Sequence, residues 1–348
     1  MILDSVRAPG PSGAPGTSLP LPYGKRLMLF SGRANPDLGR AIGARLGVGL
    51  GRVTLKTFSN DEVYCRFTDS IRGGDVFIVQ PMCGNPATGV NANDALLELL
   101  VMVDAAVGAS AHRVIAVTPW YGYSRQDKKS APREPISARL VARMLESAGV
   151  DRVLTMDLHA GQLQGFFQIP VDHMTALMML ADHFAQLDRD SGDELVVVAP
   201  DAGRVKLNKQ FATRVGAGLA ILDKERPQQQ VAEIGYVIGD VRGKTAIILD
   251  DIIDTAGTLR AAGEAVIRAG AARVFAAATH AVFSGGAYEN LAASPFELIV
   301  VTDTIPLRPG APDNVHVVSC APLLADSIRR IFTDDSVSEV FGGKNHVF

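Results

Sequence analysis

The sequence is poor in cysteine and has no excess of positive charge, and each of these shortages excludes a class of protein. Its three cysteines, Cys65, Cys83 and Cys320, lie far apart and show no CxxC spacing, which excludes a disulfide framework and favours a reducing, cytoplasmic compartment. The chain has 34 Lys and Arg residues against 37 Asp and Glu residues, a net charge of −3. It therefore lacks the broad basic surface of a nucleic-acid binder, whereas a site for small anionic substrates is not excluded.

Long hydrophobic runs are also lacking. The apolar stretch at residues 96–106 is interrupted by Asp104, so we expect no transmembrane helix and no membrane partner. The first 22 residues contain five prolines and three glycines but no continuous apolar core, which argues against a secretory signal. We predict that they form a flexible extension.

The hydrophobic content, in contrast, is high. It reaches 47% of 348 residues, which excludes a disordered or collagen-like chain and suits about two domains of about 150 residues each. From Lys25 onward, β-rich runs alternate with helical patterns, which predicts an α/β fold with a largely parallel sheet. Strands are predicted at 26–30, 53–58, 75–80, 113–118, 152–156, 194–198, 219–222, 245–249, 273–277 and 297–301. Helices are predicted at 93–106, 137–148, 175–185, 204–215, 258–269 and 321–332.

Residues 245–258, TAIILDDIIDTAGT, carry the clearest chemical signal. An apolar strand ends in the adjacent carboxylates of Asp250 and Asp251, which can accept hydrogen bonds from the two vicinal hydroxyls of a ribose. A turn of small residues then opens a helix, whose N-terminal N–H groups and dipole favour a bound phosphate. The alternative is an ordinary capped turn, but three aspartates around one strand end argue against it.

At these residues the sequence resembles the phosphoribosyl pyrophosphate-binding loop of type I phosphoribosyltransferases and ribose-phosphate diphosphokinases. Five further motifs resemble the class I diphosphokinases, in that family's order. They are FSNDE (58–62), RQDKK (125–129), DLHAGQLQGFF (157–167), PDAG (200–203) and DKERP (223–227). The resemblance extends from Lys25 to Phe341 and implies two tandem parallel-sheet domains of the type I phosphoribosyltransferase fold. On this basis we predict an extension (1–22), an ATP-side domain (23–172), a ribose 5-phosphate-side domain (173–329) and a tail (330–348) that packs on the first domain.

The resemblance implies a reaction in which the β,γ-diphosphoryl group of ATP moves to the 1-hydroxyl of ribose 5-phosphate. The products are phosphoribosyl pyrophosphate, a precursor in nucleotide biosynthesis, and AMP. Positioning and charge neutralisation dominate such a transfer, so we expect many cations and metal ligands in the site.

ATP is held, by resemblance, by residues of three motifs: Phe58, Asn60, Asp61, Glu62, Arg125, Gln126 and His159. Phe58 stacks on the adenine ring, and Asn60 and Glu62 read its polar edge. In this family these residues reach into the site of a neighbouring subunit. The resemblance therefore implies a homo-oligomer, commonly a hexamer.

Mg²⁺ is the cofactor that the resemblance implies. A lone histidine is more often structural than a ligand, but His159 within DLHA, together with Asp157 and Asp201, matches the family's magnesium ligands. Because Mg²⁺ prefers oxygen ligands and retains several waters, Asp201 is the stronger candidate. We expect His159 to act partly through water or the nucleotide phosphates.

Lys224 and Arg226 follow the predicted strand at 219–222. By resemblance they belong to a mobile flap that closes on the transferred group, and both are predicted to be catalytic, Lys224 above all. The predicted ribose 5-phosphate site consists of Arg226, Asp250, Asp251, Asp254, Thr255, Ala256, Gly257 and Thr258. A similar-looking segment, GDVRGKT at 239–245, has one residue too few for a Walker A loop and leads into a strand, so we predict a turn there.

Regulation is also implied by the resemblance. An allosteric site at which phosphate activates and ADP inhibits corresponds to Ser70, Arg72, Ser110, Gln164, Ser336 and Ser338. Three departures from the family pattern bear on this site. Gly161 stands where many relatives carry Ser, Arg204 replaces a second Gly after PDAG, and residues 86–92 form a longer stretch than usual.

Two other functions fit parts of the sequence. A phosphoribosyltransferase would use the loop at 250–258 on a ready-made diphosphate, but it has no need for FSNDE, RQDKK and DKERP. A non-catalytic regulatory paralogue would have lost catalytic residues, but Lys224, Arg226, His159, Asp201 and Asp250 are all present. The adenine-pocket residues favour ATP as donor and leave other diphosphoryl donors open.

Overall fold

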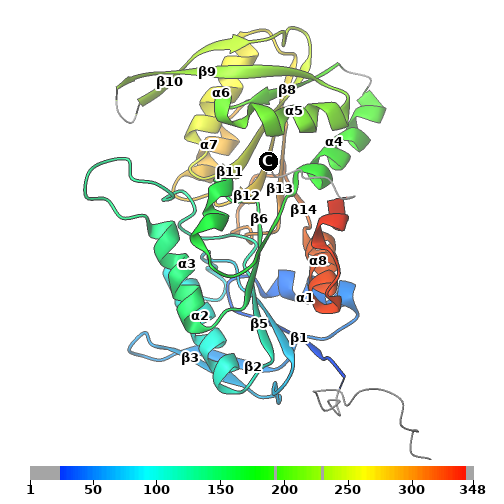
Figure 1. Ribbon diagram of the computed structural model, residues 1–348. Coiled ribbons are helices and arrows are strands. Elements are labelled where there is room, and N and C mark those ends of the chain that lie inside the picture. The colour runs from blue at the N-terminus through cyan, green and yellow to red at the C-terminus, as the bar shows by residue number, and fades with distance from the viewer. Residues whose placement is uncertain (1–23, 192–193, 229–230, 342–348) are drawn as a thin grey trace, which may run out of the picture.

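Two parallel sheets organise the chain in the computed structural model, which describes residues 24–191, 194–228 and 231–341 (Figure 1). The first sheet has the strand order β1-β4-β5-β6-β7, and each neighbouring pair is parallel. Its strands are β1 (Leu27–Ser31), β4 (Asp75–Val79), β5 (Arg113–Val117), β6 (Arg152–Met156) and β7 (Val171–Met174). Every residue of β4 is buried, as expected for a parallel sheet that is covered on both faces.

The second sheet has the order β10-β9-β8-β11-β12-β13-β14. Its strands are β8 (Leu195–Ala199), β9 (Gly218–Gln228), β10 (Val231–Ile238), β11 (Thr245–Ile253), β12 (Arg273–Ala281), β13 (Leu298–Thr302) and β14 (Val315–Val318). All neighbouring pairs are parallel except β9 and β10. The predicted α/β class with parallel sheets is confirmed.

Helices cover both faces of each sheet. The first half of the chain contributes α1 (Pro36–Leu46), α2 (Ala92–Gly108), α3 (Ser137–Ala148) and the 3₁₀ helix η1 (Gly161–Phe166). The second half contributes α4 (Leu177–Ser191), η2 (Ala202–Arg204), α5 (Val205–Val215), α6 (Gly257–Arg268), α7 (Ala287–Ala292), α8 (Ala321–Thr333) and η3 (Val337–Phe341). Among the described residues, no helix combines the length and the apolar character needed to cross a bilayer.

One apolar cluster joins the two sheets into a common core. It contains Leu29 and Phe77 of the first sheet, Val197 and Ile247 of the second, and Leu324 of α8, all buried. In Figure 1, α8, drawn in red, lies beside the blue α1, so the last long helix packs on the first. Burial of this shared core stabilises a fixed arrangement of the two halves.

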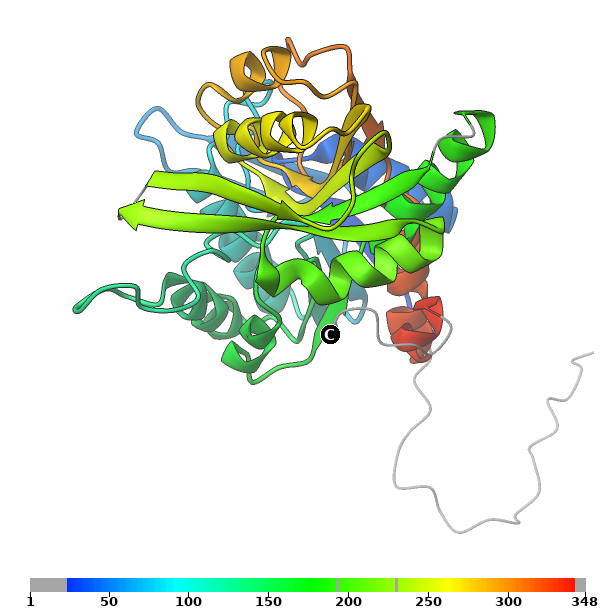
Figure 2. The same cartoon turned by 90° about the horizontal axis from the view of Figure 1, so that it is seen from above.

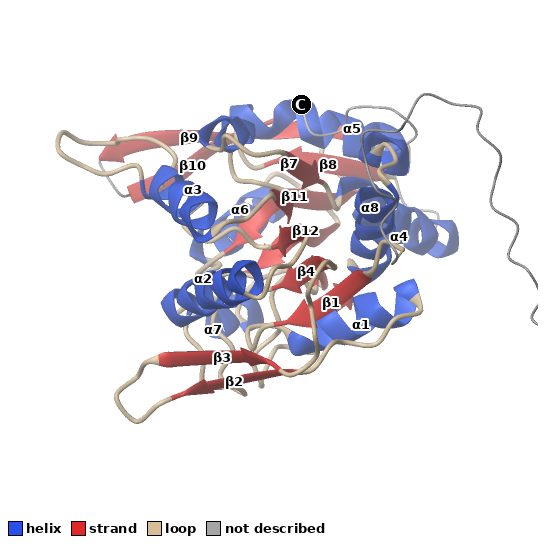
Figure 3. Cartoon of the chain, turned by 60° about the horizontal axis from the view of Figure 1, so that its bottom comes forward, coloured by secondary structure: helices blue, strands red, loops and turns tan. Residues whose placement is uncertain are grey.

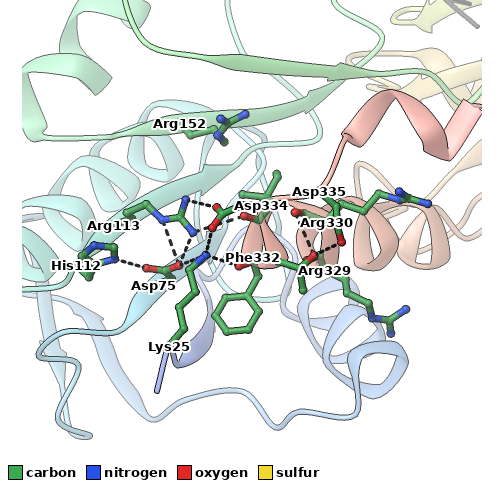
Figure 4. Close-up of polar contacts among 12 residues, drawn as sticks. Lys25, Asp75, His112, Arg113, Arg152, Arg329, Arg330, Phe332, Asp334 and Asp335 are labelled. Atoms are coloured by element: carbon green, nitrogen blue, oxygen red, sulfur yellow. Dashed lines mark hydrogen bonds and ion pairs between the residues drawn. The ribbon is translucent and has the colours of Figure 1, made fainter. Parts of the chain in front are cut away.

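A polar cluster around Asp75 reinforces the same contact (Figure 4). Asp75 at the start of β4 is 1% exposed, and its Oδ1 lies 2.7 Å from Nδ1 of His112. Nε of Arg113 donates to Asp75 Oδ2 at 3.1 Å, and Nη1 of Arg113 donates to Asp334 Oδ1 at 3.1 Å. Lys25 Nζ bonds Asp334 at 2.5 Å. The end of α8 is thereby tied to the N-terminal ends of β4 and β5 in the first sheet.

Two antiparallel hairpins depart from the parallel pattern. β2 (Val53–Thr57) pairs with β3 (Val63–Phe67) as a separate two-stranded sheet, and only β2 was predicted. β9 continues to Gln228 and pairs with β10, and in Figure 2 the two form a long arm across the second half. The predicted strand end at residue 222 was therefore wrong, because Lys224 and Arg226 lie within β9. Pairing with β10 satisfies the backbone of this charged stretch and extends the strand.

Candidate active site

The main candidate site is a cavity of about 550 Å³ between the two halves. The strands that lead to it at their carboxyl ends include β6 of the first sheet and the adjacent β8 and β11 of the second. Open α/β sheets bind ligands outside the carboxyl ends of their strands. Predicted site residues that line the cavity are Arg125, Asp157, His159, Asp201, Asp250 and Asp251.

Asp250 and Asp251 lie within β11, which runs four residues beyond the predicted strand end. Asp251 is buried, and its Oδ2 lies 2.8 Å from Nδ1 of His159 and 2.5 Å from Nη2 of Arg204. Oδ1 of Asp250 accepts the backbone N–H of Asp251 at 2.9 Å and lies 3.7 Å from Nε of Arg204. The two carboxylates therefore share one guanidinium.

The pKa values of the two carboxyls diverge. Burial, followed by the neighbouring charge of Asp251, raises the pKa of Asp250 to about 7. Burial acts in the same sense on Asp251, but the hydrogen bond from His159 and the charge of Arg204 outweigh it and lower its pKa below the usual range. A pair of titratable groups that the environment separates in this way is typical of functional sites.

His159 is oriented by this carboxylate. Because the partner of Nδ1 at 2.8 Å is Asp251, we assign the ring proton to Nδ1, which leaves Nε2 as the atom that can bind a metal or a ligand. Histidines that ligate metals commonly donate their other N–H to a carboxylate in this manner.

Asp157 has a different environment from the one expected of a metal ligand. Its Oδ2 accepts hydrogen bonds from the backbone N–H of Ala176 at 2.8 Å and from the hydroxyl of Thr279 at 2.6 Å. Nε2 of the fully buried His280 lies 3.2 Å from the Asp157 carbonyl oxygen. Asp157 therefore ties the end of β6 to the start of α4 and to β12. The sequence offered no signal for Thr279 and His280, since both lie about 120 residues away.

Asp201 begins η2, and its Oδ1 accepts the backbone N–H of Arg204 at 3.1 Å. In the described part of the chain, no group of three or more His, Cys, Asp and Glu side chains is arranged to hold a metal ion. His159, Asp201 and Asp157 thus do not form a closed ligand cluster. Mg²⁺ is commonly held by one or two carboxylates, substrate phosphates and water, and this open arrangement fits such a site.

The predicted ATP and ribose 5-phosphate segments meet through an ion pair. Nη1 of Arg125 lies 2.6 Å from Oδ2 of Asp254, and Asp254 also accepts a hydrogen bond from Ser284. Arg125 and Gln126 line a second cavity of about 1020 Å³, together with Trp120. Arg125 stands at the junction of the two cavities, because it lines both.

The turn at 255–258 opens α6, as predicted. Ala256 precedes the helix with φ +60°, and among the described residues no side chain caps the helix N-terminus by a hydrogen bond. The Thr255 carbonyl oxygen accepts from Asn290 at 2.9 Å. The first N–H groups of a 12-residue helix are thus available to an anion.

The FSNDE motif forms the tip of the β2–β3 hairpin, which extends from the body of the molecule (Figure 3). Phe58 is 42% exposed, its ring contacts Tyr64 edge-on, and Lys56 Nζ lies 4.7 Å from its ring centroid. The hairpin is closed by Phe58 N–H donating to the Glu62 carbonyl at 2.8 Å, while Asp61 adopts φ +67°. Of the described residues that line the main cavity, none comes from this tip, Asn60 included.

The six predicted regulatory residues fall into separate groups. The backbone of Gly73, next to Arg72, donates to Ser110 O at 2.8 Å, which places the segment after Ser70 beside Ser110. The hydroxyls of Ser336 and Ser338 lie 2.8 Å apart at the C-terminal end of the described chain. Gln164 lies in η1, where its amide donates to the Gly161 carbonyl. Within the described residues, no hydrogen bond or ion pair joins these three groups.

Lys224 and Arg226 lie in β9, at the register where Lys224 faces Ile234 of β10. Their side chains are outside the part that the structure describes. The backbone path alone shows that they belong to a paired strand.

Known proteins resemble this chain over nearly its whole length. Residues 27–149 match the family model of the N-terminal domain of ribose phosphate pyrophosphokinase, and residues 234–342 match the phosphoribosyl synthetase-associated domain. The ribose-phosphate pyrophosphokinase of Caldanaerobacter subterraneus subsp. tengcongensis is 47% identical over 320 residues, 92% of this chain and 99% of the relative. That of Chromobacterium violaceum is 48% identical over 319 residues, 90% and 94% of the two chains.

A solved structure agrees with these matches. The crystal structure of phosphoribosylpyrophosphate synthetase from Mycobacterium smegmatis matches with a TM-score of 0.81 and 41% identity, and covers 89% of this chain and 100% of that one. The chain thus has the α/β fold class of the type I phosphoribosyltransferases. Within that class, the chain belongs to the ribose-phosphate pyrophosphokinases.

Proposed function

We propose that this enzyme transfers the β,γ-diphosphoryl group of ATP to the 1-hydroxyl of ribose 5-phosphate and releases phosphoribosyl pyrophosphate and AMP, in the cytoplasm. The observation that carries the proposal is the β11–α6 segment, where the half-buried Asp250 and the buried Asp251 precede an uncapped helix N-terminus in a chain 47% identical to a ribose-phosphate pyrophosphokinase. The carboxylates suit the ribose hydroxyls, and the helix N-terminus suits the 5-phosphate.

ATP is proposed to bind on the Arg125 side of the cavity. Arg125 stands between the two cavities and is paired with Asp254. A guanidinium at that point can neutralise a triphosphate through paired N–H groups. Gln126 lines the neighbouring cavity and is proposed to contact the nucleotide.

Mg²⁺ is the proposed cofactor, held by Nε2 of His159 and by Asp201 together with ATP phosphates. When bound there, it supplies neutralisation of the phosphoryl charge. Asp251 fixes the His159 ring through Nδ1, and Asp157 holds the end of β6 in place through Ala176 and Thr279. These contacts support Asp157 as a positioning residue in place of a ligand.

The arm formed by β9 and β10 is proposed to bring Lys224 and Arg226 to the transferred group. Cations that meet the group only as its charge develops lower the barrier selectively. Lys224→Ala is therefore expected to reduce turnover by about 10² to 10³-fold without loss of folded protein. Lys209→Ala, an exposed lysine on α5 that does not line the main cavity, is the matched control and should retain normal turnover.

The experiment measures AMP formed from ATP and magnesium with and without ribose 5-phosphate, with inorganic phosphate supplied. Strictly sugar-dependent AMP, lost in Lys224→Ala and kept in Lys209→Ala, supports the proposal. Near-normal turnover in Lys224→Ala contradicts the assignment of this residue. No AMP from folded wild-type protein would favour a regulatory paralogue, and pyrophosphate release that depends on an added base would favour a phosphoribosyltransferase.

The hairpin tip that carries Phe58, Asn60 and Glu62 is proposed to complete the ATP site of a neighbouring subunit in a homo-oligomer, as a hexamer. Two observations support this: no residue of the tip is among the described residues that line the main cavity, and Phe58 is exposed. Phe58→Ala and Lys224→Ala should each be nearly inactive alone, because each removes one part of every site. A mixed oligomer combines an intact tip with an intact arm in some sites, so co-expression of the two variants should restore AMP formation.

Failure of the mixed oligomer to regain activity would contradict a contribution in trans.

Phosphate activation and ADP inhibition are proposed at Ser70, Arg72, Ser110, Gln164, Ser336 and Ser338. Because these residues form separate groups within one chain, the regulatory site also requires the oligomer. Activity that is insensitive to phosphate, with ADP purely competitive against ATP, would contradict it.

A further inference from the structure

Arg204 lies inside the candidate active site. It ends η2, directly before α5, and its side chain is only 16% exposed. Nη2 lies 2.5 Å from Asp251 Oδ2, and Nε lies 3.7 Å from Asp250 Oδ1. Nη2 also lies 3.4 Å from the His159 carbonyl oxygen, which accepts from it. A single guanidinium thus contacts both strand-end carboxylates and the histidine loop.

The guanidinium of Arg204 lies close to the place where a divalent ion would bind His159. Nη2 of Arg204 lies 3.3 Å from Nδ1 of His159, so a divalent ion at the other nitrogen of the same ring would face a guanidinium across the imidazole. Like charges at such separations disfavour one another, most strongly where water is excluded. Asp251 cannot relieve this repulsion fully, because Arg204 and His159 already share its Oδ2.

The charge of Arg204 is permanent. Burial lowers the pKa of Arg204, but the carboxylates of Asp251 and Asp250 outweigh burial and raise it above its ordinary value. The guanidinium can therefore leave the carboxylates only by moving, and Arg204 stands where the family pattern has a second glycine that could make no such contact.

We propose that Arg204 is a built-in cation that pairs with Asp250, Asp251 and His159 and competes with the divalent ion at His159. This inference rests on the proposed metal role of His159 and Asp201. Loading of the site then requires that Arg204 turn away from Asp251. In the absence of nucleotide and sugar, the wild-type protein therefore binds a divalent ion more weakly than a variant that lacks Arg204.

The test is calorimetric titration of purified full-length protein with Mn²⁺ alone, in the absence of nucleotide and sugar. Arg204→Gly and Arg204→Gln are both expected to bind Mn²⁺ about tenfold more tightly than wild type, and Arg204→Lys, which keeps the charge, less so. Arg214→Gln is the matched control, because Arg214 pairs with Asp182 at the other end of α5, and its Mn²⁺ affinity should equal that of wild type.

Thermal unfolding separates competition from a purely structural role. Under competition, Arg204→Gly lowers the unfolding midpoint in EDTA, because two carboxylates lose their cation, and Mn²⁺ restores it. A structural role would give the same deficit with and without Mn²⁺. Equal or weaker Mn²⁺ binding by folded Arg204→Gly, or no Mn²⁺ binding by any variant, would overturn the proposal. Sugar-dependent AMP formation by wild type is measured separately, so failure of the proposed function is distinguished from failure of this inference.

Discussion

Two carboxylate centres join distant parts of this chain, a structural centre at Asp75 and a functional centre at Asp250 and Asp251, and they differ in how fully their charge is neutralised. Asp75 contacts His112 and Arg113, and Lys25 Nζ lies 3.9 Å away. Burial alone raises the pKa of Asp75, but the hydrogen bonds from Arg113 and His112 outweigh burial and lower it. This carboxylate is held in its ionised form by its own neighbours.

Asp250 and Asp251 carry two carboxylates between them but have fewer cationic partners among the described residues than the single carboxylate of Asp75. The ion pairs of the two among the described residues involve Arg204 and His159, and the pKa of Asp250 rises to about 7. Burial by itself therefore does not distinguish a structural carboxylate from a functional one. A fully paired carboxylate fixes two segments together, whereas an incompletely paired one retains capacity for a ligand.

The largest expected effect is on the structural centre. Asp75→Asn leaves Arg113 and Lys25 without their carboxylate at the contact between α8 and the first sheet. We expect the free energy of unfolding to fall by about 3 kcal/mol, the lower end for a broken buried pair because both cations reach solvent. Urea unfolding measures this, and Asp37→Asn, in an exposed pair with Arg40, is the control that should change little.

The second effect is on the functional centre and has the opposite sign for stability. Asp250→Asn removes a charge that burial and Asp251 disfavour. Since the folded pKa of about 7 exceeds the usual value of about 3.9, the cost of ionisation accumulates as pH rises between these values and persists above about 7. At pH 8 the variant should be more stable by on the order of 1 kcal/mol.

The same variant should bind ribose 5-phosphate about tenfold more weakly, because a neutral amide accepts weaker hydrogen bonds than a carboxylate. Calorimetry with ribose 5-phosphate and urea unfolding at pH 8 give the two values. Loss of stability together with undiminished sugar affinity would remove the distinction between the two centres.

The smallest expected effect is on the stability of the protein at acidic pH. The pKa of Asp75 is lowered in the folded state. Its contribution to the free energy of unfolding is therefore present above the unfolded pKa of about 3.9 and is lost as pH falls through the folded pKa. Wild-type stability should therefore decline below pH of about 4 more steeply than that of Asp75→Asn. Parallel declines in urea midpoint would show that Asp75 is not responsible.

Much of the fold was predictable because its parallel strands are continuous apolar runs. β4, β5, β6, β8 and β11 were predicted to within a few residues at their starts. α1 was missed although Asn35 and Pro36 give a helix start, because its glycines weaken the helical pattern. β3 and the outer half of β9 were missed because pairing with a second strand stabilises them more than any hydrophobic alternation does.

The site was predictable where one segment carries the chemistry. Asp250, Asp251 and the turn to α6 are contiguous, so their geometry follows from a strand that leads into a helix. The contact of Arg204 with Asp251 was not predictable, because it depends on the adjacency of β8 and β11 in the sheet. The support of Asp157 by Thr279 depends likewise on packing between distant segments.

The most direct test of the central claim compares the turnover of Asp250→Asn and Asp75→Asn with wild type at a temperature where circular dichroism shows all three to be folded. The readout is AMP formed per folded subunit in the presence of ribose 5-phosphate. We predict that Asp75→Asn stays within about twofold of wild type and that Asp250→Asn falls below about one hundredth. Near-normal turnover of folded Asp250→Asn, or a collapse of turnover in folded Asp75→Asn, would contradict the assignment of catalysis to the Asp250–Asp251 centre and of structure to the Asp75 centre.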